Sequence, residues 1–362
     1  PVSLELTRIG VTADLLSAGA VIKPAFCGPC FGAGDVPANN GLSVRHTTRN
    51  FPNREGSKPG EKQAAGVALM DARSIAATAL CGGAITPADE IEYEVPEYEY
   101  HFDNSPYLRR VYYGFGKPQP ETPLILGPNI SDWPEQHELG EHLLVELAAV
   151  IHDEVTTTDE LIPSGETSSY RSNPRRLAEF TLSRRVPDYV PRAKASAALE
   201  AERRAGKKPE ALMSVLRLVG DAEKLIETTQ FGSAIYATRP GDGSAREQAA
   251  SCQKVLGGLA NICVEYATKR YRSNCINWGI LPFRIASGER FDCEPGDYVF
   301  VPNIRALIAS GKTEFPAKVI RTDQRVYDIK LFVDPLTDDE RQILLDGCLM
   351  NYYKNQKSSL KM

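Results

Sequence analysis

A stretch rich in tyrosine, glutamate and proline divides this 362-residue chain and constrains its fold more than any other feature. It begins near residue 91 and includes the run Lys117-Pro-Gln-Pro-Glu-Thr-Pro123. Such a run cannot hold a regular hydrogen-bonded ladder, because proline has no backbone N–H. We therefore predict a linker over residues 93–140 between two folded parts, 1–92 and 141–362. The chain is long enough to bury a sizeable core in two or three domains.

Both folded parts show the mixed pattern of an α/β protein. In the first, residues 15–20 indicate the end of a helix, and an alanine-rich helix over 70–80 stops at Gly82-Gly83, where glycine accepts positive φ. In the second, residues 143–150 read as a buried strand. We expect further strands near 233–238, 298–301, 317–320 and 327–333. We also expect an exposed helix over 196–208, a helix over 244–256, and one over 337–353 that starts with a Thr337/Glu340 capping box.

Composition excludes some classes of protein. No apolar run is long enough to cross a bilayer, and the N-terminus has no signal-peptide layout. A net charge of −5 argues against broad attraction to nucleic acid or anionic lipid. The eight cysteines are too dispersed for a disulfide framework, so we predict a reducing, cytoplasmic location. Because the chain opens on Pro1, we expect a processed or truncated product.

Cys27-Gly-Pro-Cys30 is the only close pair of cysteines in the sequence. The spacing fits a redox pair, half of a metal site, or two ligands of an iron–sulfur cluster that takes at least one more cysteine from elsewhere. It also fits two structural thiols beside a turn. Spacing alone leaves these alternatives open.

Arg49 and Arg54 lie five residues apart in a polar loop. Guanidinium groups bind carboxylates in bidentate fashion, so this loop could hold a polycarboxylate. By itself, a solvated charged loop explains the pair better.

The segment from Gly241 to Glu247 follows a predicted strand and opens a helix. The N–H groups at a helix N-terminus stabilise negative charge, either a carboxylate or the alkoxide of Ser244. Ser244 and Glu247 also have the spacing of a capping box, and both interpretations stay open. The turn Thr156-Thr-Thr158-Asp159, with Arg171 twelve residues on, could equally be an N-capping aspartate and a surface arginine.

Taken in order, these segments resemble the aconitase family. The matching motifs are Cys27-Gly-Pro-Cys-Phe-Gly, Arg49-Asn-Phe-x-x-Arg54, Thr157-Thr-Asp159 with Arg171, Gly243-Ser-x-Arg-Glu247 and Asn277-Trp-Gly-Ile-Leu-Pro282. The resemblance covers most of the chain, from about 15 to 350. It implies a hydro-lyase that dehydrates and rehydrates a small hydroxy polycarboxylic acid.

The resemblance also implies roles for individual residues. Cys27 and Cys30 match two ligands of a [4Fe-4S] cluster whose third cysteine is expected upstream of this chain. Ser244 matches the catalytic base, and Thr158 with Asp159 matches a polar pair that supports the site. The matches to binders of substrate carboxylates are Arg49, Arg54, Arg171 and Arg246. Ala245 and Thr48 depart from the family pattern, which puts citrate in doubt as the substrate.

In fold, the resemblance implies that residues 1–92 end a three-layer α/β domain and that 141–362 form a β/α swivel domain, with the active site in the cleft between them. The chain would be the C-terminal half of the enzyme, with the missing N-terminal portion as its partner. We expect Arg171, Ser244 and Arg246 to converge, with the 142–150 strand beside the 233–238 strand and the Ser244 hydroxyl exposed. The alternative functions are a cluster-free RNA-binding protein and an inactive structural relative.

Overall fold

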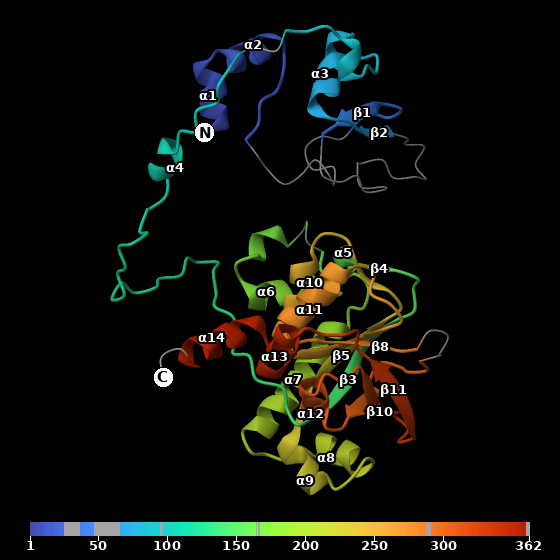
Figure 1. Ribbon diagram of the computed structural model, residues 1–362. Helices are drawn as coiled ribbons and strands as arrows, with labels where there is room; N and C mark the ends of the chain where they lie inside the picture. Colours follow the sequence, from blue (N-terminus) through green and yellow to red (C-terminus); the bar gives the residue numbers. More distant parts are fainter. Residues whose placement is uncertain are drawn as a thin grey trace. The chain divides into compact units, whose positions relative to one another are not determined.

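The computed structural model describes residues 1–24, 37–46, 66–94, 97–163, 165, 167–286 and 291–359. The chain divides into two compact units, Pro1–Thr122 and Pro123–Met362 (Figure 1). The segment predicted as a linker is shared between them, and the three-part division into 1–92, 93–140 and 141–362 stays a prediction. Helices and strands occur in both units, so the fold is mixed α/β, as predicted.

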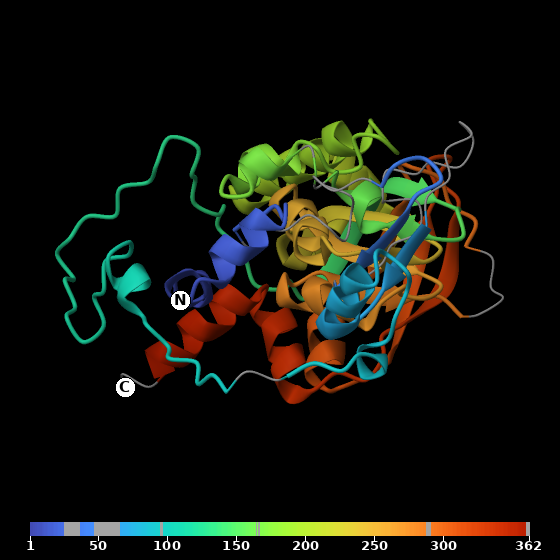
Figure 2. The same ribbon diagram turned by 90° about the horizontal axis from the view of Figure 1, so that it is seen from above.

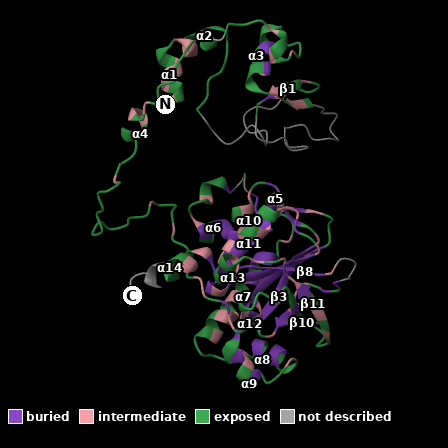
Figure 3. Ribbon diagram, viewed as in Figure 1, coloured by how far each residue is buried: buried purple, intermediate pink, exposed green. Residues whose placement is uncertain are grey.

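The first unit contains short elements with little burial. Its described helices are α1 (Val2–Arg8), α2 (Val11–Ser17), α3 (Ala72–Leu80), η2 (Ala88–Glu90) and α4 (Ser105–Leu108). Strands β1 (Leu42–Arg45) and β2 (Gly66–Leu69) pair in parallel. The carboxylate of Asp71 caps α3 by accepting the N–H groups of Arg73 and Ser74. Helices α1, α2 and α4 contain no buried residue, and Figure 3 shows this unit as mostly exposed.

The second unit is built on a closed barrel of seven strands in the order β10-β11-β8-β7-β5-β3-β9. Their bounds are β3 (His142–Ile151), β5 (Thr229–Ala237), β7 (Gly258–Cys263), β8 (Leu281–Arg284), β9 (Tyr298–Val301), β10 (Glu314–Ile320) and β11 (Val326–Phe332). Strands β3, β5, β7 and β8 are parallel neighbours, and the remaining pairs are antiparallel. The prediction that residues 142–150 lie beside 233–238 is confirmed by the pairing of β3 with β5.

Helices and two short strands lie between these strands, and the last two helices follow β11. They are β4 (Thr156–Thr157), α5 (Thr158–Leu161), η3 (Ser168–Tyr170), α6 (Pro174–Ala178), α7 (Tyr189–Arg204), α8 (Glu210–Arg217), α9 (Ala222–Thr228), β6 (Pro240–Asp242), α10 (Arg246–Val255), α11 (Lys269–Asn277), α12 (Ile304–Ala309), α13 (Asp338–Asp346) and α14 (Leu349–Ser359). Strands β4 and β6 form a separate two-stranded parallel sheet. No helix in the described ranges combines the length and the apolar character needed to cross a bilayer.

The core follows from the alternation of side chains along the strands. Leu143, Val145 and Leu147 of β3 are buried in one cluster that takes residues from all seven barrel strands. This is the period of two expected for inward-facing positions of a small barrel. A second cluster joins Ala149 and Ile151 to helices α6, α7, α10 and α11, and a third packs α8 and α9 on Leu144. Figure 3 shows the buried residues concentrated in these strands.

Two predicted helices need correction. The single helix expected over 337–353 is wrong: its capping box forms, but α13 ends at Gly347, which has a φ of 87°, and α14 begins two residues later. The bend, drawn in red in Figures 1 and 2, allows the backbone of His137 to pass against Gly347, where a Cβ would lie 1.9 Å from the carbonyl oxygen. The exposed helix expected over 196–208 is α7, which starts earlier and buries Tyr189, Ala193 and Ser196.

Candidate functional site

The carboxyl ends of the parallel strands carry four of the predicted site residues. After β3 the chain passes through β4 into α5, which contains Thr158 and Asp159. After β5 it passes through β6 to Ser244 and into α10, which begins at Arg246. Because parallel strands end at the same edge, the two loops that follow them are neighbours, and this edge is where α/β proteins usually bind ligands.

The two loops are joined by direct contacts. Residues Thr156 and Pro240 are register partners in the β4–β6 sheet. The backbone N–H of Ala245 donates to Oγ1 of Thr158 over 3.3 Å. Gly243 has a φ of +128°, and a Cβ there would lie 2.3 Å from the same hydroxyl oxygen. The structure therefore brings the Thr158 segment and the Ser244 segment together.

Thr158 and Asp159 differ in exposure. Thr158 is buried, with 1% of its surface exposed. Asp159 is half-buried and pairs with Arg184 at 3.6 Å. The alternative of Asp159 as an N-cap is wrong, because Thr157 caps α5 in a capping box with Glu160. The supporting and catalytic roles assigned to Thr158 and Asp159 stay predictions.

Ser244 is exposed, as expected for a catalytic base. The helix that follows begins at Arg246, two residues later than predicted, with Ala245 as its N-cap. The carboxylate of Glu247 accepts hydrogen bonds from Asn274 Nδ2 and Trp278 Nε1, each at 2.5 Å. The capping-box interpretation of Ser244 is therefore wrong, because Ser244 is not the N-cap and Glu247 bonds to α11 and the residue after it.

Arg171 is exposed at the end of η3. The preceding Tyr170 stacks on Phe180 with ring centroids 5.5 Å apart, and the guanidinium of Arg176 lies 5.4 Å from the Tyr170 ring centroid. These contacts hold η3 on α6, and α6 packs against α10. Arg171 thus belongs to the group of elements that carries Ser244, and its convergence with Ser244 and Arg246 stays a prediction.

Sequence reasoning missed two adjacent arginines near the end of β3. Arg184 pairs with Asp159, and Arg185 pairs with Asp153, which lies two residues after the end of β3. Arg185 also lines a cavity of about 450 Å³ together with Val150, Ile151, His152, Asp153 and Val186. The signal in the sequence was the pair of arginines in Ser183-Arg-Arg-Val186, which gives no indication of its partners.

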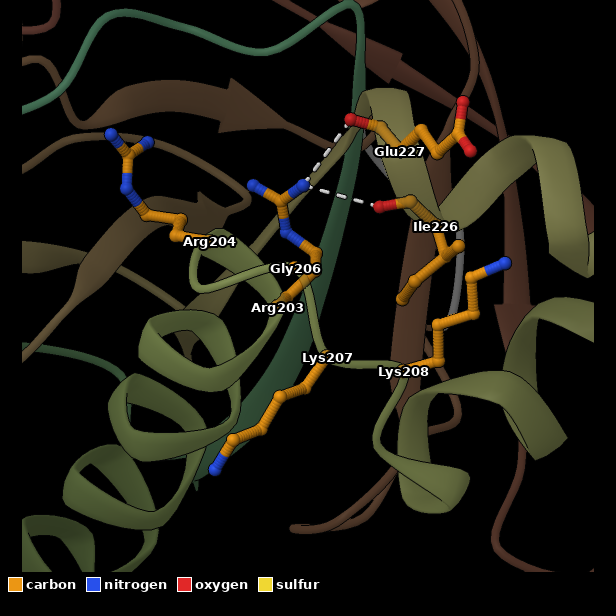
Figure 4. A pocket seen from close by; sticks show the side chains of 7 residues that line it. All are labelled: Arg203, Arg204, Gly206, Lys207, Lys208, Ile226 and Glu227. Atoms are coloured by element: carbon orange, nitrogen blue, oxygen red, sulfur yellow. Dashed lines mark hydrogen bonds between the residues drawn. The ribbon is translucent and has the colours of Figure 1, made fainter.

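A basic hollow of about 440 Å³ lies at a different place, where α7 ends (Figure 4). Arg203 donates there to the carbonyl oxygens of Ile226 and Glu227, at 3.1 and 3.3 Å. Those carbonyls precede β5, so the hollow lies at the amino end of that strand. None of the predicted site residues lines it.

The predicted cluster ligands Cys27 and Cys30 lie outside the described residues, as do Thr48, Arg49 and Arg54. Of the cysteines that are described, Cys81 is exposed, and Cys252, Cys263, Cys275, Cys293 and Cys348 are buried. Burial raises the pKa of Cys252 and of Cys275 to about 12, which keeps these thiols protonated at neutral pH. The described parts of the chain contain no group of three or more histidine, cysteine or acidic side chains placed to hold a metal ion.

Comparison with known proteins gives three findings. The model of the aconitase family (aconitate hydratase) matches residues 1–78. Two mitochondrial homoaconitases, from two strains of Cryptococcus neoformans var. neoformans serotype D, are each 26% identical to this chain over 269 residues. That match covers 74% of this chain and 32% of each homoaconitase, so the chain spans about a third of the length of these relatives. The solved structure of a 3-isopropylmalate dehydratase from Methanocaldococcus jannaschii is 22% identical, covers 61% of this chain and 98% of that one, and has a TM-score of 0.36.

Proposed function

We propose that this chain carries part of the active site of a hydro-lyase acting on a small hydroxy polycarboxylic acid. Its similarity to the aconitase family and to homoaconitases supports the proposal. The observation that best supports this is the position of Ser244. It is exposed at the carboxyl edge of the parallel strands and directly precedes the N-terminus of α10.

Ser244 is the proposed base that removes the proton next to a substrate carboxylate. A serine hydroxyl is a poor base in water, so its alkoxide needs stabilisation from its surroundings. The N–H groups of the first turn and the dipole of the ten-residue helix α10 supply partial positive charge at its N-terminus. The contact between Thr158 and the N–H of Ala245 fixes the loop that carries the serine.

Arg246 and Arg171 are the proposed binders of substrate carboxylates. Arg246 is the first residue of α10, so its guanidinium extends from the same helix end as Ser244. Removing a proton beside a carboxylate builds up negative charge, and fixed guanidinium groups stabilise that charge without reorganisation. Arg49 and Arg54 are proposed to bind further carboxylates.

Cys27 and Cys30 are the proposed ligands of a [4Fe-4S] cluster, with a third cysteine from the remainder of the enzyme. When bound, the cluster supplies a Lewis-acidic iron that helps hydroxide to leave.

The remainder of the enzyme is the proposed partner, in line with the share of the homoaconitases that this chain covers. Residues 1–92 are proposed to form the end of a three-layer α/β domain, and residues 141–362 are proposed to form a swivel domain. The dispersed free thiols support a reducing compartment such as the cytoplasm.

Replacement of Ser244 by alanine tests this function in the complete, cluster-loaded enzyme. With hydroxy di- and tricarboxylic acids as substrates, we expect kcat to fall by about 10²- to 10⁴-fold, the usual contribution of a general base. The midpoint of unfolding and the iron content should not change, because the Ser244 side chain is exposed.

Ser214→Ala is the matched control, because Ser214 is an exposed serine on α8 whose hydroxyl bonds only locally to Ala211. It should keep full activity. If Ser244→Ala turns over substrate as fast as Ser214→Ala, Ser244 is not the base.

A further inference from the structure

The end of the linker is bonded to the backbone on both sides of Arg171. Asn129 Nδ2 donates to the carbonyl oxygen of Ser169 over 2.5 Å. The backbone N–H of Ser131 donates to the carbonyl oxygen of Ser172 over 3.1 Å. The Ser131 hydroxyl donates to Oδ1 of Asn173, the residue that caps α6, over 2.9 Å. All these residues belong to the second unit. The segment that carries Arg171 is thus attached to the linker at three points.

The same linker end also reaches α10 through two tryptophans. The rings of Trp133 and Trp278 lie 4.5 Å apart between centroids and are inclined by 43°. Trp278 Nε1 donates to one carboxylate oxygen of Glu247, and Asn274 Nδ2 donates to the other. Glu247 follows Arg246 in the first turn of α10. Trp133 therefore stabilises a chain of contacts that ends beside Arg246.

We propose that residues 129–133 act as a positioning strap that sets the places of Arg171 and Arg246 together, with Trp133 and Glu247 as positioning residues. The inference rests on the proposed function, in which these two arginines bind carboxylates. A guanidinium binds a carboxylate through two parallel hydrogen bonds, so a small displacement of its backbone weakens the interaction strongly. One segment that holds both backbones keeps the distance between the two arginines constant.

Substitutions of Trp133 and Glu247 can disturb the positions of the arginines without disrupting the core of the barrel. Trp133 is 38% exposed, so its truncation leaves no cavity inside the barrel, whose core lies in other residues. The two oxygens of Glu247 serve different donors, and a glutamine at this position can accept only one of the two hydrogen bonds.

Hydrogen exchange of the full-length protein tests the strap without reference to activity. In Trp133→Ala we expect the amides of residues 170–173, 175–177 and 249–251 to exchange about tenfold faster, because local opening of both segments becomes easier. Trp133→Phe should restore slow exchange at both, since it keeps an aromatic ring against Trp278. Leu124→Ala, which truncates a linker side chain that is 87% exposed, is the matched control and should change neither segment. Unchanged exchange in Trp133→Ala, or a change in one segment only, would overturn the proposal.

Calorimetric binding of tricarballylate, a tricarboxylate without a hydroxyl group, tests the link to the arginines. We expect Trp133→Ala and Glu247→Gln to raise the Kd about tenfold. The Kd of Trp133→Phe and of Leu124→Ala should stay close to that of the unmodified protein. An unchanged Kd in both Trp133→Ala and Glu247→Gln would overturn the positioning role. These binding measurements use the complete, cluster-loaded enzyme. If that enzyme with the unmodified chain does not bind tricarballylate, the proposed function fails, and the exchange measurement still decides whether the strap exists.

Discussion

Lys254 is a lysine buried on α10, which is rare for this residue. Its Nζ donates to the carbonyl oxygen of Gly279 over 3.3 Å. Burial lowers the pKa of Lys254 from 10.5 to about 8, because the charged ammonium is poorly solvated there. A charge in this position opposes folding near neutral pH.

Stability should therefore depend on pH through Lys254. Between about pH 8 and 10.5 the unfolded chain binds a proton that the folded protein has released, so stability rises with pH in this window. Below about pH 8 both states are protonated and the full penalty, roughly 3 kcal/mol, is present. We expect the stability of the natural protein relative to Lys254→Met, measured by urea unfolding, to rise from pH 7 towards pH 10.

Lys207→Met provides the control, because Lys207 is exposed. The difference in the free energy of unfolding between this variant and the natural protein should stay constant over the same pH range. A constant difference for Lys254→Met as well would show that the pKa of Lys254 is the same in the folded and unfolded states, because its surroundings solvate the charge.

Asp297 joins two elements of the barrel, strand β9 and the turn between β10 and β11. It is fully buried and accepts the backbone N–H groups of Glu294 and Thr322, at 2.8 and 2.9 Å. Its carboxylate also pairs with Arg321 at 3.2 Å. These three contacts satisfy a carboxylate that would otherwise be costly to bury.

Asp297→Ala should lower the free energy of unfolding by about 3 kcal/mol, because it leaves two backbone N–H groups and the Arg321 charge without their buried acceptor. Asp323→Ala, in the same turn, should have little effect, since Asp323 pairs with Arg325 at the surface. Urea unfolding of both variants measures the difference. Equal losses would mean that Asp297 contributes no more than a surface aspartate.

At the scale of the whole molecule, the two units differ in how much they bury. The three large hydrophobic clusters lie in residues from 139 onwards. Large side chains of the preceding segment are exposed, with Tyr112 at 74% and Phe115 at 84%. The second unit therefore has the burial needed to fold cooperatively by itself.

Brief digestion with chymotrypsin should first cut the chain after Tyr112, Tyr113 or Phe115, where aromatic side chains are exposed and the chain lacks helix and strand. We expect a resistant product that starts between residues 113 and 116, identified by mass spectrometry, and a single thermal transition for it. Early cuts between β3 and β11 would show that the barrel is not the stable part of the molecule.

Local patterns in the sequence determined the elements that depend on neighbouring residues alone. The apolar run at 143–150 is β3, the Thr337/Glu340 capping box starts α13, and the alanine-rich run is α3. Each of these depends on periodicity or on hydrogen bonds between residues three or four apart, which the order of amino acids specifies directly. The resemblance to the aconitase family likewise came from the motifs, because a motif and its spacing are properties of residue order alone.

Contacts between distant residues decided the rest. The sequence allowed Ser244 and Glu247 to form a capping box, but Glu247 bonds to Asn274 and Trp278, about thirty residues further on. The sequence does not show why position 243 is a glycine, whereas in the structure the hydroxyl of Thr158 leaves no room for a Cβ there. A one-dimensional pattern cannot show which of several hydrogen-bond partners lies nearest, because that depends on how the strands order themselves in the barrel.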